Sequence, residues 1–320
     1  MPKTRAPSLR RLIPARSPAM REVVALLEKV LDREAGVLLV GESGAGKDYL
    51  AQCLHACGIR RAEPFVQIDC AAIPAELFES EMFGYERGAF TDARARRSGK
   101  LEAAQRGTAY LDNIAALALP LQAKLLRTVQ EKEFTRLGGS LPIPLRARIV
   151  ASAPPDIASR VDEGAFRSDL FYRLNVVTIA IPPLRERRED IVPLVERFLE
   201  ESAARIGRIV RGIDPAALEL LEMHSWPGNV RELRNVIERA VIVESSETLT
   251  TGSLPLEGFA SPIDFVARAS EERWPLDRLE AIYIRDVLRR TRSNYSQAAA
   301  ILGINRKTLL EKRKKYGIED

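Results

Sequence analysis

The amino-acid sequence predicts an α/β domain with a mainly parallel sheet, followed by a small helical subdomain and a C-terminal all-α domain. Short apolar runs alternate with helix-compatible segments between residues 14 and 183, an order typical of a parallel sheet. The strand-like runs stop after Pro182-Pro183. Residues 273–320 then show three short helical patterns, and the stretch before them is rich in Ser, Thr, Gly and Pro.

Within this plan, residues 1–13 are expected to be an N-terminal arm and residues 14–183 the α/β subdomain. Apolar residues at helical spacing predict helices over 20–31 and 119–130. A helix-compatible segment also follows the first strand, at 49–54. The strand-like runs lie at 37–40, 64–68, 107–112, 147–152 and 176–180.

The second half of the chain is expected to be helical. Residues 184–245 contain an amphipathic pattern over 188–206 and two further helices near 215–224 and 229–243. Residues 246–272 are predicted to be a linker. Residues 273–320 form the last domain, and no internal repeat is present. Its helices are predicted at 276–290, 296–302 and 305–316.

Composition narrows the class of protein. The chain has 320 residues, 46% hydrophobic and 29% charged, as expected for two or three globular domains. No apolar run approaches the roughly 20 residues that span a bilayer, and residues 1–16 lack the apolar core of a signal peptide. The three cysteines and two histidines show neither a disulfide framework nor zinc spacing. We therefore expect a cytoplasmic protein.

The charge is unevenly distributed. Residues 273–320 carry twelve Lys or Arg and six Asp or Glu, so the whole basic excess of the chain, net +5, lies in its last 48 residues. A basic excess confined to one small domain indicates a nucleic-acid partner at the C-terminus.

A glycine-rich turn between a strand and a helix predicts a nucleotide site. The glycines let backbone N–H groups face one point, the helix start adds its positive dipole end, and the lysine supplies a charge for the outer phosphates. The alternative is a glycine-rich turn that happens to have a lysine beside it. Asp48 stands where the general pattern has the Ser or Thr that helps to hold magnesium. The residues of the turn are Gly41, Glu42, Ser43, Gly44, Ala45, Gly46, Lys47 and Asp48.

Five long segments show that the chain resembles bacterial enhancer-binding proteins, the AAA+ ATPases that activate transcription by RNA polymerase carrying sigma-54. The similarity covers residues 14–245 and 276–318. It implies an AAA+ P-loop domain, a helical lid and a Fis-type helix-turn-helix domain, with ATP and magnesium as cofactors. The segments are GESGAGKD, MFGYERGAFTDA, LQAKLLRTVQEKEFTRLGG, FRSDLFYRLNVVTIAIPPLRERREDI and WPGNVRELRNVIERAVI.

The resemblance assigns the second nucleotide element to residues 104–113, with Asp112 as the magnesium carboxylate of the Walker B strand. Alone, this segment would be read as an ordinary strand end. The next residue is usually a Glu that polarises water, and here it is Asn113; the Asn that normally contacts that Glu is here Asp69. The exchange either keeps a carboxylate near the water or leaves hydrolysis slow. The sensor strand normally ends in Thr-Asn, and here it ends in Ala153-Pro154.

Three arginines match the family's nucleotide-site arginines. Arg167 and Arg173 match arginine fingers that enter the neighbouring subunit's site, where a guanidinium is worth ~10³–10⁵ in rate. Their alternative is a solvated or salt-bridged arginine, because Asp169 lies between them. Arg231 matches the lid arginine that contacts the nucleotide in cis. Sites shared between subunits imply a homo-oligomer, from a dimer to a hexameric ring.

Residues 86–93 resemble the loop with which the family contacts sigma-54. An aromatic residue flanked by small residues is useful on a surface only if a partner binds it; alternatively, Phe90 packs into the domain. Asp92 replaces a glycine of the family's loop, which adds a charge and removes backbone freedom. The expected contact residues are Gly88, Ala89, Phe90, Thr91, Asp92 and Ala93.

The C-terminus resembles a Fis-type helix-turn-helix that binds double-stranded DNA at upstream sites. Residues at the start of a recognition helix meet base edges, so Arg306, Lys307 and Thr308 are the predicted readers, after the N-cap Asn305. Residues 312–315 are expected to bind phosphates. The alternative is a solvated basic face. The predicted DNA-binding residues are Ser296, Gln297, Asn305, Arg306, Lys307, Thr308, Lys312 and Lys315.

Two functions follow from these patterns. The first is an activator that binds upstream DNA, forms a ring and hydrolyses ATP to remodel the closed complex of sigma-54 RNA polymerase. The second is a DNA-bound regulator, working with a partner subunit or as a repressor, whose nucleotide site switches by binding with little hydrolysis. The sequence shows no receiver or other sensory domain ahead of the ATPase segment, so control is expected to come from another source.

Overall fold

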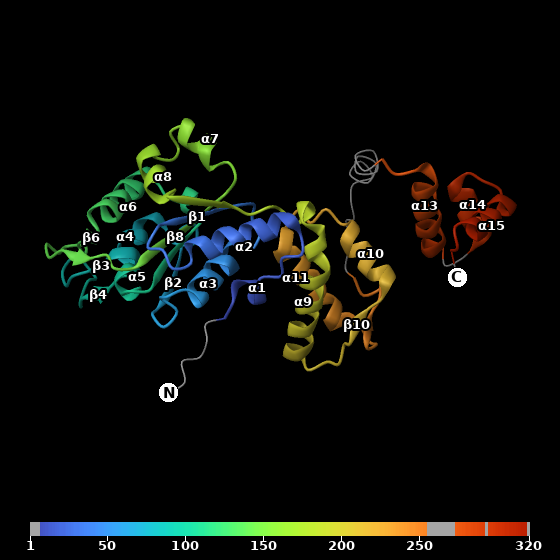
Figure 1. Cartoon of the computed structure of the whole chain (residues 1–320), viewed down its shortest axis with the longest axis horizontal. Helices are drawn as coiled ribbons and strands as arrows, with labels where there is room; N and C mark the ends of the chain where they lie inside the picture. The colour runs from blue at the N-terminus through green and yellow to red at the C-terminus, as the bar shows by residue number, and fades with distance from the viewer. Residues whose placement is uncertain (1–6, 255–272, 292–293, 319–320) are drawn as a thin grey trace. The chain divides into compact units, whose positions relative to one another are not determined.

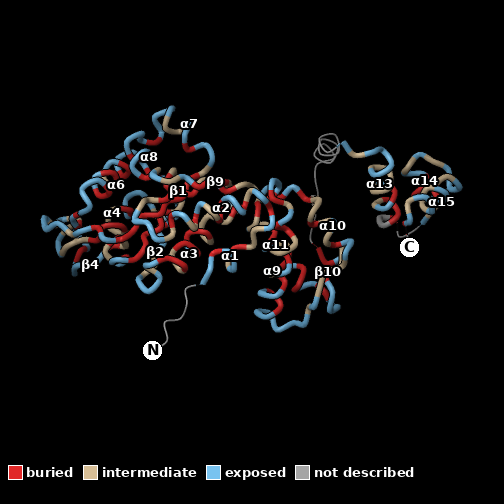
Figure 2. Tube along the Cα trace, viewed as in Figure 1, coloured by how far each residue is buried: buried red, intermediate tan, exposed pale blue. Residues whose placement is uncertain are grey.

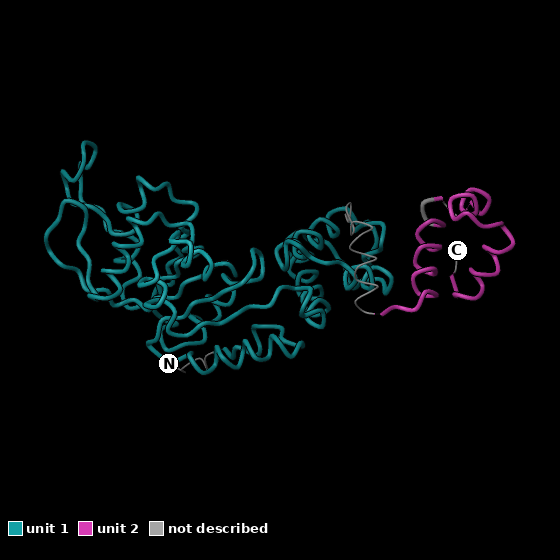
Figure 3. The backbone as a smooth tube through the Cα atoms, turned by 90° about the horizontal axis from the view of Figure 1, so that it is seen from above, with its two compact units in different colours: residues 1–256 teal, residues 257–320 magenta. Residues whose placement is uncertain are grey.

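The computed structural model describes residues 7–254, 273–291 and 294–318. The chain divides into two compact units, Met1–Leu256 and Glu257–Asp320 (Figure 3). Each unit has its own hydrophobic core, and each is treated separately below. None of the helices in the described part of the chain is long and apolar enough to cross a membrane.

The first unit is built on a five-stranded, all-parallel sheet in the order β2-β5-β8-β1-β9 (Figure 1). The five predicted strands are therefore confirmed. The central strand β8 lies between β5 and β1, so the segments that follow these three strands meet at one edge of the sheet. The strands are β1 (Val37–Val40), β2 (Phe65–Asp69), β5 (Thr108–Asp112), β8 (Arg148–Ala153) and β9 (Val177–Ala180).

Helices cover both faces of this sheet, and successive residues of β1 show why. Leu38 is buried in the cluster on one face and Leu39 in the cluster on the other, because side chains alternate along a strand. Both layers appear as buried segments in Figure 2. On the Leu39 face lie α1 (Leu9–Leu12), α2 (Pro18–Val30) and α3 (Lys47–Cys57); on the Leu38 face lie α4 (Ala75–Phe83), α5 (Lys100–Ala103), α6 (Leu119–Glu131), α7 (Ile157–Asp162) and α8 (Ser168–Leu174).

The first predicted helix begins at a good cap. Ser17 Oγ accepts a hydrogen bond of 3.2 Å from the Met20 N–H, and Pro18 occupies the first helical position. The predicted N-terminal arm is shorter than expected, since Leu9 and Ile13 are buried with α2 and α3. Both residues are apolar, and they pack into this core. Residues 1–6 of the arm lie outside the described residues.

Two short hairpins extend one end of the α/β subdomain (Figure 1), and the 3₁₀ turn η1 (Ile114–Ala116) follows β5. An isolated bridge between Tyr85 and Leu137 joins the hairpins. The first hairpin, formed by β3 (Gly84–Tyr85) and β4 (Arg97–Ser98), carries the residues 86–93 that resemble the sigma-54 contact loop. The second hairpin consists of β6 (Glu133–Phe134) and β7 (Ile143–Pro144).

The predicted helical subdomain, called the lid here, follows β9. Its core contains Trp226, which is completely buried and donates its indole N–H to the Leu221 carbonyl oxygen at 2.8 Å. The lid consists of η2 (Leu184–Glu186), η3 (Arg188–Asp190), α9 (Ile191–Ile206), β10 (Gly212–Ile213), α10 (Pro215–Met223), α11 (Asn229–Val243) and β11 (Thr248–Leu249).

The start of the predicted linker belongs to the lid. Strand β11 pairs in parallel with β10, and Leu249 and Leu254 are buried in the lid core. The Glu244 carboxylate folds this segment by accepting hydrogen bonds from the backbone N–H groups of Ser245, Ser246 and Thr250. These serine and threonine residues therefore form a turn of the lid and not a linker. Residues 255–272 of the predicted linker lie outside the described residues.

The second unit contains the three predicted C-terminal helices, α13 (Leu276–Arg290), α14 (Tyr295–Leu302) and α15 (Arg306–Lys315). Ala298 and Ala299 of α14 are buried against Leu309 of α15, since small side chains let the helices approach closely. Gly303, with φ of +64°, ends α14, and the Asn305 side chain accepts from the Thr308 N–H at 2.8 Å. This is the predicted helix-turn-helix arrangement.

Candidate functional site

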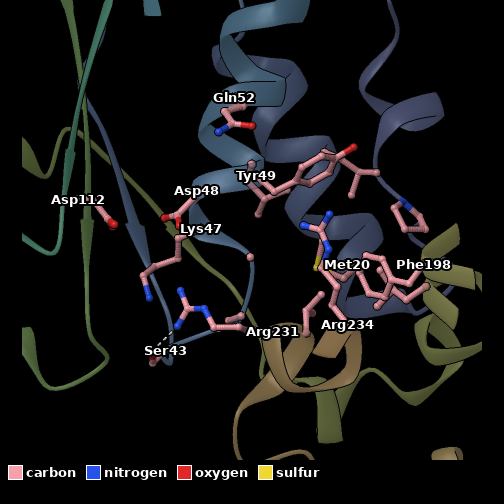
Figure 4. Close-up of a pocket in the computed structure, with 18 of the residues that line it drawn as sticks. Met20, Ser43, Lys47, Asp48, Tyr49, Gln52, Asp112, Phe198, Arg231 and Arg234 are labelled. Carbon is pink, nitrogen blue, oxygen red and sulfur yellow. Dashed lines mark hydrogen bonds between the residues drawn. The ribbon is translucent and has the colours of Figure 1, made fainter. Parts of the chain in front are cut away.

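A cavity of about 560 Å³ opens beyond the carboxyl ends of β1 and β5, against the lid (Figure 4). Its lining contains four elements predicted from sequence to act together: the glycine-rich turn, the strand end at Asp112, the Asp69 segment and Arg231 of the lid. The structure therefore places in one site residues that are up to 188 positions apart in the sequence.

The glycine-rich turn has the backbone that a phosphate-binding loop needs. Gly44 and Gly46 have φ of +74° and +102°, and a Cβ at Gly44 would lie 2.3 Å from the Gly228 carbonyl oxygen. The Lys47 ammonium donates to the carbonyl oxygens of Gly41 and Glu42 at 2.8 and 2.9 Å. Burial lowers the pKa of Lys47, and the carboxylates of Asp112 and Asp48 oppose this shift.

Two carboxylates meet beside Lys47. The Tyr110 hydroxyl lies 2.8 Å from Asp48 Oδ1 and 3.0 Å from Asp112 Oδ1. Burial raises the pKa of Asp48, and the neighbouring Asp112 charge raises it further. Tyr110 therefore stands between the carboxylate at the start of α3 and the carboxylate at the end of β5.

A buried serine organises the end of β5. The Ser152 hydroxyl on β8 donates to Asp112 Oδ1 at 2.5 Å and accepts the Asn113 backbone N–H at 2.8 Å. Asn113 has φ of +54°, a conformation that Asn tolerates better than most residues. Ser152 is completely buried.

Asp69 and Asn113, the exchanged pair, both line the cavity. The Asp69 carboxylate accepts the N–H groups of Ala71 and Ala72 at 2.9 and 3.2 Å, which closes a turn after β2. Among the described residues no hydrogen bond joins Asp69 to Asn113. Their predicted interplay in catalysis stays a prediction.

The glycine-rich turn is bound to the lid through Glu42. Its carboxylate accepts two hydrogen bonds from the Arg185 guanidinium, at 2.6 and 2.9 Å, and one from Asn229 Nδ2 at 3.0 Å. These bonds lower the pKa of Glu42 to about 2, the one from Arg185 contributing most. A movement of the lid would therefore shift the glycine-rich turn.

Arg231 of the lid reaches the same turn. Its Nη1 donates to Ser43 Oγ at 3.1 Å, and its backbone N–H donates to the Gly44 carbonyl oxygen at 3.3 Å (Figure 4). Its side chain is exposed to the cavity. The contact of Arg231 with a nucleotide in cis stays a prediction.

A second lid contact passes through Arg187, which is 4% exposed. Its Nη2 donates to the Ala45 carbonyl oxygen at 2.6 Å, and burial lowers its pKa to about 10. The nearby Asp190 carboxylate accepts the backbone N–H groups of Arg16 and Ser17 at 2.6 and 2.8 Å. One short stretch of the lid thus holds both the turn and the segment before α2.

The segment before α2 contributes apolar side chains to the side of the cavity away from Lys47, where Arg234 also lies (Figure 4). A flat heteroaromatic base fits such a wall, whereas the charged side suits phosphates. The apolar residues of this wall are Ile13, Pro14, Met20, Leu194 and Phe198.

The two predicted arginine fingers lie outside the lining of this cavity. Arg167 forms an exposed ion pair with Asp169 at 2.7 Å. In a single chain, Arg167 is therefore the salt-bridged arginine expected from sequence as the alternative. Arg173 Nη2 donates to the Val129 carbonyl oxygen at 3.4 Å. Neither contributes to its own chain's site.

The loop expected to contact sigma-54 is folded back on itself. The Gly88 N–H donates to the Ala93 carbonyl oxygen at 2.8 Å, and Ala93 is buried. The Phe90 ring meets the Tyr85 ring edge-on, with centroids 4.9 Å apart, and is still 44% exposed. The Phe90 ring therefore packs against Tyr85 and remains partly exposed to solvent.

The predicted DNA-binding face of the second unit divides into two groups. Arg306 and Lys307 are exposed at the start of α15. Lys312 and Lys315 are paired with α13, to Glu280 at 2.7 Å and to Asp277 at 3.0 Å. Such exposed pairs are weak and can exchange for a phosphate.

Two further contacts stabilise the C-terminal helices; one uses the Arg313 side chain, the other only the backbone of Gln297, whose side chain is exposed. Arg313, expected to bind phosphate, donates to the Ile318 carbonyl oxygen at 2.8 Å and lies over the Tyr295 ring. Gln297 donates its backbone N–H to the Asn294 side chain at 3.2 Å, next to Ser296 at the start of α14.

Sequence reasoning missed several residues of the site, mainly Ser152, Tyr110, Arg187 and Asn229. Ser152 and Tyr110 lie on apolar strands, where the sequence does not distinguish them from residues that only pack in the core. Arg187 belongs to a run of charged residues that looks solvated. The available signal was position, since Tyr110, Arg187 and Asn229 lie inside predicted motifs and Ser152 directly precedes Ala153-Pro154.

Comparison with known families gives three consecutive matches. Residues 13–180 match the sigma-54 interaction domain, residues 185–263 the AAA+ ATPase lid domain, and residues 275–316 the bacterial regulatory proteins of the Fis family. The first match covers the α/β subdomain, the second covers the lid from residue 185 and runs on to residue 263, and the third covers the helices of the second unit.

Curated relatives align over almost the whole chain. The chain is 43% identical over 311 residues to the transcriptional regulatory protein ZraR of Klebsiella oxytoca, covering 97% of this chain and 70% of that protein. It is 43% identical to the regulatory protein AtoC of Escherichia coli K12, covering 95% and 67%. It is 41% identical to the DNA-binding transcriptional regulator NtrC of Azospirillum brasilense, covering 95% and 69%.

Solved structures agree. NtrX from Brucella abortus in complex with ATP is 36% identical with a TM-score of 0.69, covering 95% of this chain and 69% of that one. The NtrX structure in complex with ADP is 35% identical, with a TM-score of 0.69 and coverage of 97% and 71%. The chain thus belongs to the family of sigma-54-dependent transcriptional activators, with an AAA+ domain, its lid and a Fis-type helix-turn-helix domain.

Proposed function

We propose that this chain binds ATP in the cavity described above and uses it, as a ring of subunits on upstream DNA, to remodel the closed complex of sigma-54 RNA polymerase. The observation that carries the proposal is the convergence of Lys47, Asp112 and Arg231 on one cavity while Arg167 and Arg173 lie outside it. Such a site would be completed by the arginines of a neighbouring subunit, each able to change the rate by ~10³–10⁵.

Different groups of lining residues suit the phosphates and the base of the nucleotide. The backbone N–H groups of the turn and the helix start of α3 favour the phosphates, with Lys47 beside the outer ones. The apolar wall around Met20 and Phe198 suits the base. NtrX, which is similar in fold, has been solved with ATP and with ADP, which supports an adenine nucleotide for this chain.

The site also fits magnesium. Asp112 Oδ1 accepts hydroxyl hydrogen bonds, and no hydrogen bond from the described residues reaches Oδ2. Carboxylate oxygens are the ligands that this hard cation prefers, and it usually keeps several waters. Asp112 would hold the ion, with Asp48 beside it. When bound, the ion would neutralise charge on the outer phosphates.

A second candidate function is a nucleotide-binding switch with little hydrolysis. It is favoured by the amide at Asn113, which cannot accept a proton from water, and by the Asp69 carboxylate, which is engaged by two backbone N–H groups. In this version ATP changes the position of the lid and the assembly state, and DNA binding does the regulatory work.

The decisive experiment follows transcription from a sigma-54 promoter carrying this protein's selected binding site. The parent is supplied with ATP or with a non-hydrolysable analogue, and its steady-state ATPase rate is measured in parallel. ATP-dependent open complexes that the analogue does not support favour remodelling. Nucleotide binding without turnover, and equal effects of ATP and analogue, favour the switch.

Lys47→Ala provides the matching test of the site itself. We expect it to abolish nucleotide binding while the thermal unfolding curve without nucleotide is retained, because in the described part of the chain the ammonium donates hydrogen bonds to two carbonyl oxygens of the turn and to no other element. Lys29→Ala, an exposed lysine of α2 outside the cavity, is the control. Equal nucleotide affinity in Lys47→Ala and the parent would show that the turn is not the phosphate site.

A further inference from the structure

We infer that Ser152 is a positioning residue of the nucleotide site, which orients the Asp112 carboxylate toward the bound divalent cation. The inference rests on the proposed function, since it concerns the cation that accompanies ATP. It assigns the polar role of the sensor strand to a residue one place before Ala153-Pro154, which offer no polar side chain.

The Ser152 hydroxyl uses both its donor and its acceptor capacity on two consecutive residues of the neighbouring strand end. It donates to Asp112 Oδ1 at 2.5 Å and accepts the Asn113 N–H at 2.8 Å. One hydroxyl therefore fixes the rotation of the Asp112 side chain and the backbone of the residue at the water-activating position. A serine that only filled the core would not need both bonds.

The sheet explains why this residue can do so. Strand β8 lies between β1 and β5, and Leu111 of β5 is in register with Ala151 of β8. The next residues along, Asp112 and Ser152, lie on these adjacent strands at the carboxyl edge of the sheet. On the other side, Ser152 is in register with Leu39 of β1, two residues before the glycine-rich turn.

The other hydroxyl at Asp112 cannot replace Ser152. Tyr110 has one proton to donate, and its oxygen lies within 3.0 Å of both Asp48 Oδ1 and Asp112 Oδ1. Its donation is shared between two carboxylates. The Ser152 hydroxyl, which also hydrogen-bonds the Tyr110 hydroxyl, makes the shorter contact with Asp112 Oδ1, 2.5 Å against 3.0 Å. With Oδ1 held in this way, Oδ2 is the oxygen presented to a cation.

Hydrogen bonds that orient a metal-binding carboxylate typically change metal affinity by about 10–100-fold when they are removed. We therefore expect Ser152→Ala to weaken the dependence of nucleotide binding on the cation and to leave the phosphate contacts of the turn intact. Loss of a buried hydroxyl that served only packing would weaken binding equally with and without the cation.

The experiment titrates the full chain with a fluorescent N-methylanthraniloyl derivative of ATP, once with magnesium and once with EDTA. The measured quantity is the ratio of the two dissociation constants. Ser152→Ala is expected to lower the magnesium-dependent gain by about tenfold with little change in EDTA, and Ser152→Thr, which keeps a hydroxyl, to restore most of it. Ser202→Ala, the same change at a buried lid position outside the cavity lining, should match the parent.

Ser152→Cys replaces the hydroxyl with a thiol, a weak donor, and tests the same position if Ser152→Ala does not fold. Tyr110→Phe, which keeps the ring that stacks on Phe65 at 6.0 Å, should reduce the magnesium-dependent gain less than either change at Ser152. An unchanged ratio in Ser152→Ala, or in Ser152→Cys where Ser152→Ala is unfolded, overturns the inference. If the parent itself binds no nucleotide in either buffer, the proposed function fails instead.

Discussion

Glu42 in the glycine-rich turn and Asn229 at the start of α11 are joined by a hydrogen bond of 3.0 Å from Asn229 Nδ2 to Glu42 Oε2. Asn229 also accepts the Leu184 N–H at 2.8 Å, and Arg185 binds the other side of the same carboxylate. The turn that would hold phosphates is thus bound to the beginning of the lid and to the start of α11. Nucleotide binding and lid position should therefore be coupled.

This contact predicts an acid-sensitive stability. Arg185 and Asn229 lower the pKa of Glu42 from 4.5 to about 2. The folded protein therefore favours the ionised carboxylate more strongly than the unfolded chain does. The stabilisation is fully present above about pH 4.5 and is lost as the pH falls toward 2. Other carboxylates titrate in the same range, so the comparison is between the parent and Glu42→Gln.

The measurement is thermal unfolding without nucleotide at several pH values between 7 and 3. Glu42→Gln should be less stable than the parent at pH 7, and the two should converge as the pH falls. Glu163→Gln, an exposed carboxyl group at the end of α7, should follow the parent throughout. A constant difference between Glu42→Gln and the parent over this range would show that the charge of Glu42 is unimportant.

The lid boundary predicts which fragments are stable. A fragment that ends at residue 244 lacks Leu249 and Leu254, which are buried in the lid core. Burial of one such side chain contributes about 1.5–3 kcal/mol. We expect the fragment 1–254 to unfold at a higher temperature than 1–244 and to keep nucleotide binding, while both lose sequence-specific DNA binding. Equal unfolding temperatures would place the end of the lid at residue 244 after all.

The parallel sheet could be predicted from sequence because each strand is a short apolar run between glycine-rich or helical segments. Long motifs likewise identified Lys47, Asp112 and Arg231, and the structure brings these three to one cavity. The cause is general: the carboxyl ends of parallel strands meet at one edge.

What sequence could not supply were contacts that depend on strand order. Ser152 is 40 residues from Asp112 and becomes its neighbour only because β8 lies beside β5. The end of the lid was missed for another reason. Ser245, Ser246 and Thr250 have the composition of a linker, and their conformation is set by the single carboxylate of Glu244.

The recognition helix predicts different effects for two kinds of basic residue. Arg306→Ala removes an exposed side chain from the first position of α15 and should cost about 1–3 kcal/mol on a selected site, with less effect on unrelated DNA. Lys314→Ala should weaken binding to all sequences and reduce the salt slope by about 1. Lys312→Ala should act less than Lys314→Ala, because Lys312 must first leave Glu280.

Fluorescence anisotropy at several salt concentrations separates these cases, with a site first selected from random DNA. The full chain is used so that any oligomerisation is retained. If Arg306→Ala weakened specific and unrelated DNA equally, the start of α15 would not read bases. A larger loss in Lys312→Ala than in Lys314→Ala would assign the phosphate contact to the α13 side of the helix.

The exchanged pair gives the last prediction. Asp69 and Asn113 line one cavity and retain one acid and one amide between them, so we predict that Asp69 has taken over part of the work of the missing carboxylate. Asn113→Glu alone should not restore fast turnover, since two carboxylates would then share the site and one would tend to take up a proton. It would also place Glu at a φ of +54°, at a cost of roughly 1–2 kcal/mol.

The double change Asp69→Asn with Asn113→Glu should turn over fastest, and the interaction is measured as a double-mutant cycle on the steady-state ATPase rate. The structure supplies the control. Asn at position 69 can still accept the Ala71 and Ala72 N–H groups, whereas Asp69→Ala removes that turn. A rate that falls in Asp69→Asn as far as in Asp69→Ala therefore reports the missing charge, not a collapsed loop. Additive effects in the cycle, or unchanged hydrolysis in Asp69→Ala, would mean that the two residues changed independently in a slow ATPase.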